Sequence, residues 1–159
     1  MKEKRSKSYI IGIVVIGLLL SFKSFYDHRE RNLADELKYD QKDYESLTAI
    51  KTVLEEEDHN DWVTSDIEPM EELISFLSQY DVKKVNETQF NEIANDDLRF
   101  VFAIYNFREK SKFVGVSENT VTLDEVIGRG KIYFKVVNGP IDMEWINSYY
   151  EKYGELYRD

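Results

Sequence analysis

Residues 98–107 read LRFVFAIYNF, and this stretch decides the fold class. Its apolar side chains fall on both alternating sets of positions, whereas a strand with one wet face would carry them on one set only. The stretch therefore predicts a β-strand in the interior of a sheet, with both of its faces covered. The remainder of the chain then has to supply neighbouring strands and the layers that cover them.

Three shorter strand patterns follow this stretch. Residues 113–116 and 120–123 are apolar and β-branched, and they surround the polar turn at residues 117–119, which predicts a hairpin. Residues 131–137, KIYFKVV, predict a further strand. One face of that strand carries Ile132, Phe134 and Val136.

Residues 44–56 fit two patterns equally well. Leu47, Ile50 and Leu54 recur at helical spacing, yet the same segment also alternates, with β-branched residues throughout. We favour a strand, because residues 61–64 follow an acidic turn in the manner of the returning arm of a hairpin.

Two stretches predict helices. The first begins at Ser65, whose Ser-x-x-Glu pattern fits a capping box, and Pro69 falls in its first turn, where the missing N–H costs no hydrogen bond. The second follows Pro140 and is expected to end at Gly154, because glycine readily adopts the left-handed conformation. The apolar positions are Met70, Leu73, Ile74, Leu77 and Tyr80 in the first helix and Ile141, Trp145, Ile146, Tyr149 and Tyr153 in the second.

Residues 81–97 carry isolated apolar residues and predict an extended segment followed by a loop or a helical turn. The order of elements predicts an α+β fold over residues 44–159, with one antiparallel β-sheet and two packed α-helices.

The amino-terminal region holds the most apolar stretch, residues 9–22, YIIGIVVIGLLLSF. With residues 23–26 it predicts a transmembrane helix in the lipid bilayer, because Lys23 at a helix end can extend its ammonium to the headgroups. A cleaved signal peptide is the alternative. Cleavage needs small residues at two positions before the cut, and Leu19 or Phe22 would occupy the first of them, so we favour an uncleaved signal-anchor.

Basic residues predict the orientation of this helix, since lysine and arginine favour the cytoplasmic side. Lys2, Lys4, Arg5 and Lys7 precede the apolar stretch. The predicted organisation is a single-pass protein of the cell membrane with an extracellular domain. Its parts are a cytoplasmic basic tail at 1–8, the transmembrane helix at 9–26, a charged stalk at 27–43 and the extracytoplasmic domain at 44–159.

Charge and cysteine content exclude several functions. The chain carries a formal net charge of −10, which repels nucleic-acid phosphates, so no nucleic-acid partner is expected. The absence of cysteine removes disulfides, thiol catalysis and thiolate zinc sites.

The acidic run from Glu55 to Asp61 is a candidate calcium site, because Ca²⁺ prefers carboxylate oxygens. An EF-hand loop starting at Asp58 fails, since it lacks the required glycine, and we interpret the run as a solvated turn; weak calcium binding stays open. His59 within this run suits a surface residue better than a general base. The sequence therefore predicts no metal site and no cofactor.

Carboxylate pairs are the one catalytic possibility that the sequence offers. Asp96 or Asp97 with Asp124 or Glu125 could act on a glycan, as paired acids do in glycosidases. Acids are common in this chain, so we predict no catalytic residue. Asn86-Glu87-Thr88 matches a glycosylation sequon by pattern alone.

Tyrosines crowd the carboxyl terminus and form the candidate binding patch, because exposed tyrosines favour contacts with proteins or glycans. Those at helical spacing suit the core, whereas Tyr150 and Tyr157 are expected to stay exposed. The residues of this patch are Tyr149, Tyr150, Tyr153 and Tyr157.

The basic start followed by an apolar stretch, the lack of cysteine and the abundance of Lys, Glu and Tyr resemble small single-pass membrane-anchored envelope proteins of unknown function from low-GC Gram-positive bacteria. The predicted anchor, the compact acidic domain and the lack of an assembled catalytic group favour a non-catalytic extracytoplasmic interaction or sensing module, with an envelope protein or a glycan as partner. A small carboxylate-dependent envelope hydrolase and a structural accessory subunit of a membrane complex are the alternatives.

Overall fold

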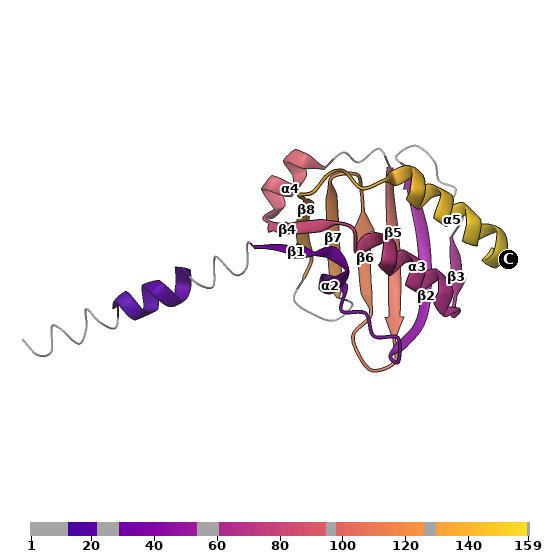
Figure 1. Cartoon of the computed structure of the whole chain (residues 1–159), viewed down its shortest axis with the longest axis horizontal. Helices are drawn as coiled ribbons and strands as arrows, with labels where there is room; N and C mark the ends of the chain where they lie inside the picture. Colours follow the sequence, from indigo (N-terminus) through magenta and orange to yellow (C-terminus); the bar gives the residue numbers. More distant parts are fainter. Residues whose placement is uncertain (1–12, 22–28, 54–60, 95–97, 126–129, 159) are drawn as a thin grey trace, which may run out of the picture.

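The structure is a computed structural model of the chain, and it describes residues 13–21, 29–53, 61–94, 98–125 and 130–158. An eight-stranded sheet forms the body of the molecule, and every pair of neighbouring strands is antiparallel (Figure 1). Across the sheet, the strands follow the order β1 (Glu30–Asn32), β4 (Asp81–Val85), β8 (Ile132–Val136), β7 (Thr120–Glu125), β6 (Lys112–Val116), β5 (Leu98–Asn106), β2 (Tyr44–Val53) and β3 (Trp62–Thr64).

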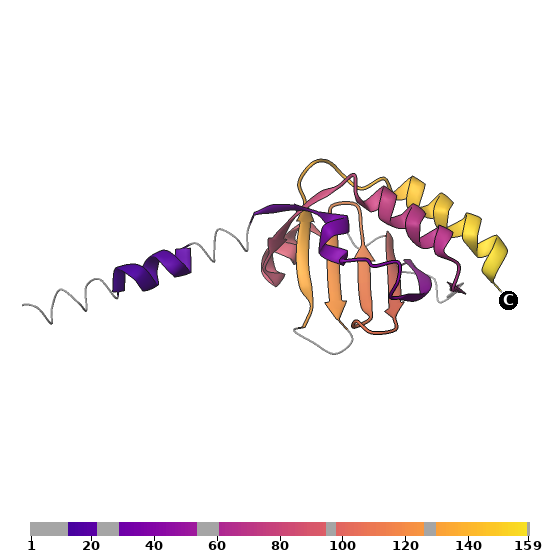
Figure 2. The same ribbon diagram turned by 60° about the horizontal axis from the view of Figure 1, so that its bottom comes forward.

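Helices cover the sheet unequally. The elements α3 (Ile67–Leu77) and α5 (Met143–Tyr157) lie side by side on one face, as Figures 1 and 2 show. Two shorter helices, α2 (Leu33–Leu37) and α4 (Glu87–Ile93), lie toward the end of the sheet where β1 and β4 run. We call the side under α3 and α5 the helix face and the other side the open face.

The strand predictions are confirmed in outline. Residues 44–53 form β2, which pairs with β3, and β6 and β7 form the predicted hairpin. The stretch at 98–106 forms β5 between β2 and β6, inside the sheet as predicted. The prediction that both of its faces are covered holds for one face: Phe100, Phe102 and Ile104 are buried, whereas Val101 and Tyr105 on the other face remain partly exposed.

The two predicted helices exist, with different ends. The N-cap of α3 is Asp66 and not Ser65, and the Thr64 hydroxyl accepts a hydrogen bond of 3.0 Å from the Asp66 N–H. The helix α5 continues past Gly154 to Tyr157. Gly154 instead leaves room for the Arg158 guanidinium, which a Cβ at that position would meet at 2.6 Å.

The capping box of this chain lies at α4, where a loop or a helical turn was expected. The Asn86 side chain accepts from the Gln89 N–H at 2.9 Å, and the Gln89 side chain accepts from the Asn86 N–H at 3.3 Å. Asn86 therefore acts as a helix cap in this fold. The fold contains α2 and α4 in addition to the two helices that were predicted.

The predicted stalk at 27–43 belongs in part to the domain. Residues 30–32 form the edge strand β1, which pairs with β4, and α2 follows at once. Leu33 and Leu37 are each 1% exposed and enter the core. These two leucines are four positions apart, so one helical face carries both into the core.

The predicted transmembrane helix over 9–26 is contradicted. Residues 13–21 form a helix, while 9–12 and 22–26 lie outside the described residues. Within the described parts of the chain, no helix combines the length and the apolar character needed to cross a bilayer. This finding also overturns the signal-anchor, the single-pass topology and the predicted membrane localisation with a cytoplasmic amino terminus and an extracellular domain.

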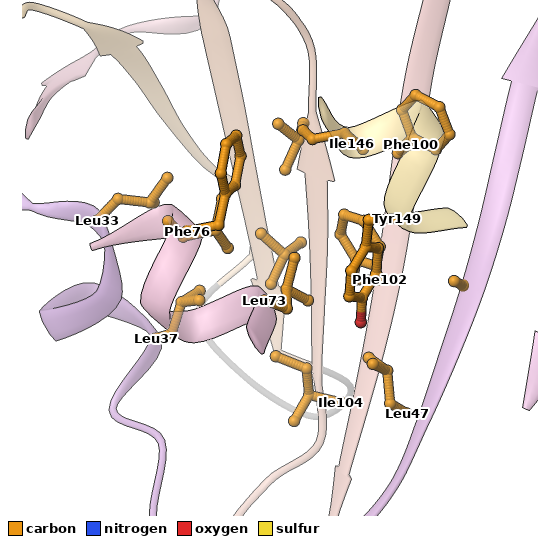
Figure 3. Packing of buried hydrophobic residues seen from close by; sticks show 14 of the residues in the cluster. Leu33, Leu37, Leu47, Leu73, Phe76, Phe100, Phe102, Ile104, Ile146 and Tyr149 are labelled. Carbon is orange, nitrogen blue, oxygen red and sulfur yellow. The ribbon is translucent and has the colours of Figure 1, made fainter. Parts of the chain in front are cut away.

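One contiguous core lies between the sheet and the helices on the helix face. Figure 3 shows Leu73 and Phe76 of α3 and Ile146 and Tyr149 of α5 in one layer with Phe100, Phe102 and Ile104 of the sheet. The core extends across five strands through a row of residues that lie directly opposite one another on neighbouring strands, because such residues share a face of the sheet. That row is Ala49, Phe102, Val114, Leu123 and Ile132.

Replacing Leu37 by alanine tests whether residues 30–37 belong to the folded domain. The variant should lower the free energy of unfolding by about 2–5 kcal/mol, because it opens a cavity in the core. Leu156→Ala is the matched control, since Leu156 is 66% exposed and its loss should cost less than about 0.5 kcal/mol. Urea unfolding followed by circular dichroism measures both values. Equal free energies of unfolding for the two variants would show that residues 30–37 lie outside the folded domain.

Candidate functional site

The four tyrosines predicted as a binding patch surround one tryptophan. Their rings lie around Trp62, with centroid distances of 6.0 Å for Tyr149, 6.3 Å for Tyr150, 5.9 Å for Tyr153 and 6.2 Å for Tyr157. Trp62, Tyr149, Tyr150 and Tyr153 are each at most 2% exposed. Only Tyr157 reaches the surface, and only partly, so the predicted patch lies mainly in the core.

The polar atoms of this aromatic cluster bind other parts of the protein. The Tyr149 hydroxyl donates to the Pro69 carbonyl at 2.9 Å, and the Trp62 indole N–H donates to the Tyr150 carbonyl at 2.9 Å. The Tyr157 hydroxyl donates to the Asp66 carboxylate at 2.6 Å. These bonds join β3 and α3 to α5, which gives the cluster a structural role.

A small polar group closes the edge of the cluster. The Glu72 carboxylate accepts from the Lys152 ammonium at 2.7 Å and from the Tyr153 hydroxyl at 2.6 Å. The hydrogen bonds to Glu72 and Tyr153 raise the pKa of Lys152 to about 12. Burial opposes ionisation of Glu72, but the bonds from Lys152 and Tyr153 outweigh it and lower the Glu72 pKa. Both shifts favour the charged forms of Glu72 and Lys152 at neutral pH.

The structure describes only one member of each carboxylate pair in the hydrolase hypothesis, Asp124 or Glu125. Asp124 and Glu125 are consecutive in β7, so their side chains point to opposite faces. Glu125 lies 3.7 Å from the Lys110 ammonium. Asp96 and Asp97 lie outside the described residues, as do residues 55–60 of the acidic run and His59. Among the described residues, no three His, Asp or Glu side chains could hold a metal ion.

A hollow of about 550 Å³ opens beside the start of α5, between Leu98, Ile141 and Met143. Three carboxylates lie on its rim, from Glu118, Asp142 and Glu144. Asp142 already caps α5, because it accepts from the Trp145 N–H at 2.9 Å. The hollow lies between the start of α5 and the β6–β7 turn. A hydrogen bond connects these two parts of the chain, from the Ile141 N–H to the Glu118 carbonyl at 2.7 Å.

The open face of the sheet carries the candidate functional site. Side chains on this face alternate with the buried ones and form their own registered rows. Among the described residues, α2, α3 and α5 leave this face uncovered, and α4 reaches only its β8 end. One row across five strands is Ile50, Val101, Gly115, Thr122 and Tyr133.

Five apolar or aromatic side chains lie together at the β2, β3, β5 and β6 end of the open face. Val63 is 55% exposed, and the others are partly exposed. One row of directly opposed residues crosses the four strands β3, β2, β5 and β6, and it consists of Val63, Thr48, Ala103 and Phe113. The five apolar or aromatic side chains in this area are called the open-face patch below, and they are Ile50, Val63, Val101, Tyr105 and Phe113.

Arg99 lies flat beside the open-face patch. Its side chain extends from β5 over Gly115 of β6, and its guanidinium donates a hydrogen bond to the Thr122 hydroxyl of β7. A Cβ at Gly115 would overlap that guanidinium, so glycine provides the path for the arginine. A guanidinium has five N–H donors. Among the described residues, Thr122 is the one acceptor of this guanidinium, so its other N–H groups are available to an external acceptor.

Lysines lie on the open face at its β4 and β8 end, away from the open-face patch. Lys83 and Lys135 are directly opposite each other in the β4–β8 register, and like charges in such pairs are destabilising. Glu30 of β1 lies opposite Lys83 on its other side. The Lys131 ammonium lies 5.9 Å from the centre of the Tyr133 ring. The open face therefore carries charges of both signs, since Glu30 lies beside Lys83 and Asp124 lies opposite Phe113.

The helix α4 limits the open face at β8. The Phe90 ring packs on Tyr133 with centroids 4.9 Å apart, and the Tyr133 hydroxyl donates to the Glu87 carboxylate at 3.1 Å. The uncovered area therefore extends from β7 to β3.

Comparisons of this chain with protein families, with curated proteins and with solved structures find no match.

Sequence reasoning missed Arg99, Tyr105 and Phe113 as site residues. The alternation in residues 98–107 placed Val101 and Tyr105 on a covered face, since apolar residues occupy both sets of positions. One available signal was Arg99 itself, because a charged residue within an apolar strand argues against a second buried face.

Alkaline pH tests the buried hydroxyl of Tyr149. Burial raises the Tyr149 pKa far above that of an unfolded tyrosine, with the neighbouring Tyr153 and Glu72 adding to the rise. Because the folded-state pKa is the higher one, this tyrosine contributes stability that is fully present below about pH 10 and is lost as the pH rises above it. The free energy of unfolding should therefore fall above pH 10, measured by urea unfolding at successive pH values.

Tyr149→Phe is the matched variant for this measurement. Above pH 10 it should make the fall in unfolding free energy shallower by about 1.4 kcal/mol per pH unit, because one proton no longer separates the two states. The same slope in both proteins would show that Tyr149 ionises freely in the folded state.

Proposed function

We propose that this chain is a non-catalytic interaction module that binds a protein partner through the open face of its sheet. The observation that carries the proposal is the open-face patch, with Arg99 fixed beside it, on a sheet face left uncovered by α2, α3 and α5. The other face of the same sheet is closed by a complete core.

The composition of the open face supports a protein partner. Interface centres are enriched in aromatic residues and arginine, and their hot spots are surrounded by apolar contacts that exclude water. Tyr105, Phe113 and Arg99 are residues of these types, and Ile50 and Val101 lie among them. A partner that covered this area would bury apolar surface now partly in contact with water.

The charges define the chemistry of the partner. Arg99 is a cation of the uncovered area, while the chain as a whole is acidic. A partner segment that places a carboxylate beside Arg99 and apolar side chains over the open-face patch fits both features. The arginine can bind a carboxylate through two parallel hydrogen bonds.

The fixed position of Arg99 supports recognition by this residue. Its bond to Thr122 and its path over Gly115 hold the guanidinium flat on the sheet before any partner arrives. Less side-chain entropy is therefore lost on binding than for a free surface arginine.

Site-specific photocrosslinking tests this proposal. A benzophenone amino acid in place of Tyr105 should crosslink to one protein partner in cells that produce the chain, identified by mass spectrometry. The same amino acid in place of Glu155, an exposed residue of α5, is the control and should not give that product. Crosslinks from both positions to the same proteins, or from Tyr105 to a second copy of this chain or to glycan alone, would contradict the proposal.

Substitution of Arg99 tests the interaction once the partner is purified. Arg99→Ala should raise the Kd at least about tenfold, because hot-spot arginines contribute more than about 1.4 kcal/mol. Gly115→Ala should weaken binding in the same direction, since its methyl group takes the place of the guanidinium. Glu155→Ala is the control and should leave the Kd unchanged. Calorimetric titration measures the Kd, and unchanged binding by Arg99→Ala would refute the assignment.

A further inference from the structure

A hollow of about 360 Å³ lies between the end of α2 and strands β6, β7 and β8. Its lining includes the cations Lys38, Lys110 and Lys112 and the carboxylates Glu36 and Glu125. We infer that this hollow is a binding site for a small organic oxyanion, a carboxylate or a phosphate ester, held by the ammonium groups of Lys112 and Lys38. The site is independent of the open face.

Lys112 is the central group of this site. It is 5% exposed, and its ammonium donates to the Leu37 carbonyl at 2.6 Å. The Glu109 carboxylate lies 3.9 Å away, beyond hydrogen-bonding distance, and within the described residues no other group accepts from this ammonium. An ammonium has three donors. Two N–H groups of a buried charge are therefore available to an acceptor in the hollow.

The burial of this charge points to a ligand. A buried charge is costly unless it is paired and hydrogen-bonded. Burial lowers the pKa of Lys112, although Glu109 acts in the opposite direction. An oxyanion in the hollow would pair with the ammonium and accept the two remaining N–H groups.

Glu125, which lies opposite Lys112 in the β6–β7 register, attracts this ammonium, but no described carboxylate accepts a hydrogen bond from it, and the carboxylates of the hollow have other cations nearby. Glu36 lies 2.9 Å from the Arg31 guanidinium, and Glu125 lies 3.7 Å from the Lys110 ammonium. The Glu109 side chain is 59% exposed. Its backbone is held elsewhere, because the Glu109 N–H donates to the Asp43 carboxylate at 2.7 Å.

Lys38 is the second cation of the site. It ends α2 in the left-handed conformation, with φ of 48°, and among the described residues it is the one non-glycine residue with a positive φ. Glycine usually occupies this position after a helix, because a Cβ is strained there. The chain therefore carries a lysine at a strained position that borders the hollow.

The walls of the hollow restrict the class of ligand. Leu123 and Ile132 supply apolar surface opposite the lysines. A carboxylate or a phosphate ester with a short hydrocarbon body would contact both the ammonium groups and this wall. Phe113, the residue after Lys112, points to the open face, so the two sites lie on opposite sides of β6.

Titration of the full chain with sodium butyrate and, separately, with inorganic phosphate tests the site. Backbone amide shifts are followed by NMR at constant ionic strength set with chloride. Saturating shifts confined to Leu37, Lys38, Lys112 and Gly130 are expected with at least one of the two probes. The tighter probe identifies the headgroup that the site prefers. Linear shifts spread over exposed lysines with both probes would overturn the inference.

Variants separate the site from general attraction of anions. Lys112→Met keeps the apolar stem and removes the charge, and it should weaken binding at least about tenfold, since a charge-assisted hydrogen bond is lost. Lys42→Met removes an exposed lysine outside the hollow and should leave the affinity unchanged. Lys38→Ala, which leaves Lys112 in place, should weaken binding even if Lys112→Met fails to fold. Equal affinity in Lys38→Ala and Lys42→Met would reject the site.

Discussion

Burial of one face of an antiparallel sheet under two helices is the constraint on which the rest of this structure depends. The helix face collects Phe100, Phe102, Val114 and Phe134 against α3 and α5. Because successive side chains of a strand point to opposite sides, a core on one face leaves every second residue on the other. The aromatic cluster around Trp62 completes this core at β3, where a short edge strand would otherwise have little to hold it.

The same alternation produces two separate candidate sites from neighbouring residues. Lys112 extends toward α2 and the oxyanion hollow, whereas Phe113 lies on the open face with the proposed interaction surface. Each site depends on a residue in an unusual position. Gly115 allows Arg99 to lie flat across β6, and Lys38 adopts a left-handed conformation at the end of α2.

The amino-terminal half of the chain shows where sequence patterns mislead. The charged segment at 27–43 has few apolar residues, yet two of them, Leu33 and Leu37, are buried in the core. The apolar stretch at 9–22 is the most hydrophobic part of the chain, yet among the described residues no helix has the length and apolar character of a membrane span. Local hydrophobicity ranks segments by composition, but it does not show whether a given leucine reaches the core.

By itself, the sequence determined the strands at 98–106, 112–116, 120–125 and 132–136, the two long helices and the α+β class, because these depend on local periodicity and turn residues. For residues 44–53 the sequence fitted a helix and a strand equally well, and pairing with β3 and β5 decided the strand. Tertiary structure alone decided which face of each strand is covered, that Tyr150 is buried under α5, and that Arg99 and Thr122 meet across β6. Pairing register and helix docking bring together residues far apart in the chain, and a single sequence contains no local signal for such contacts.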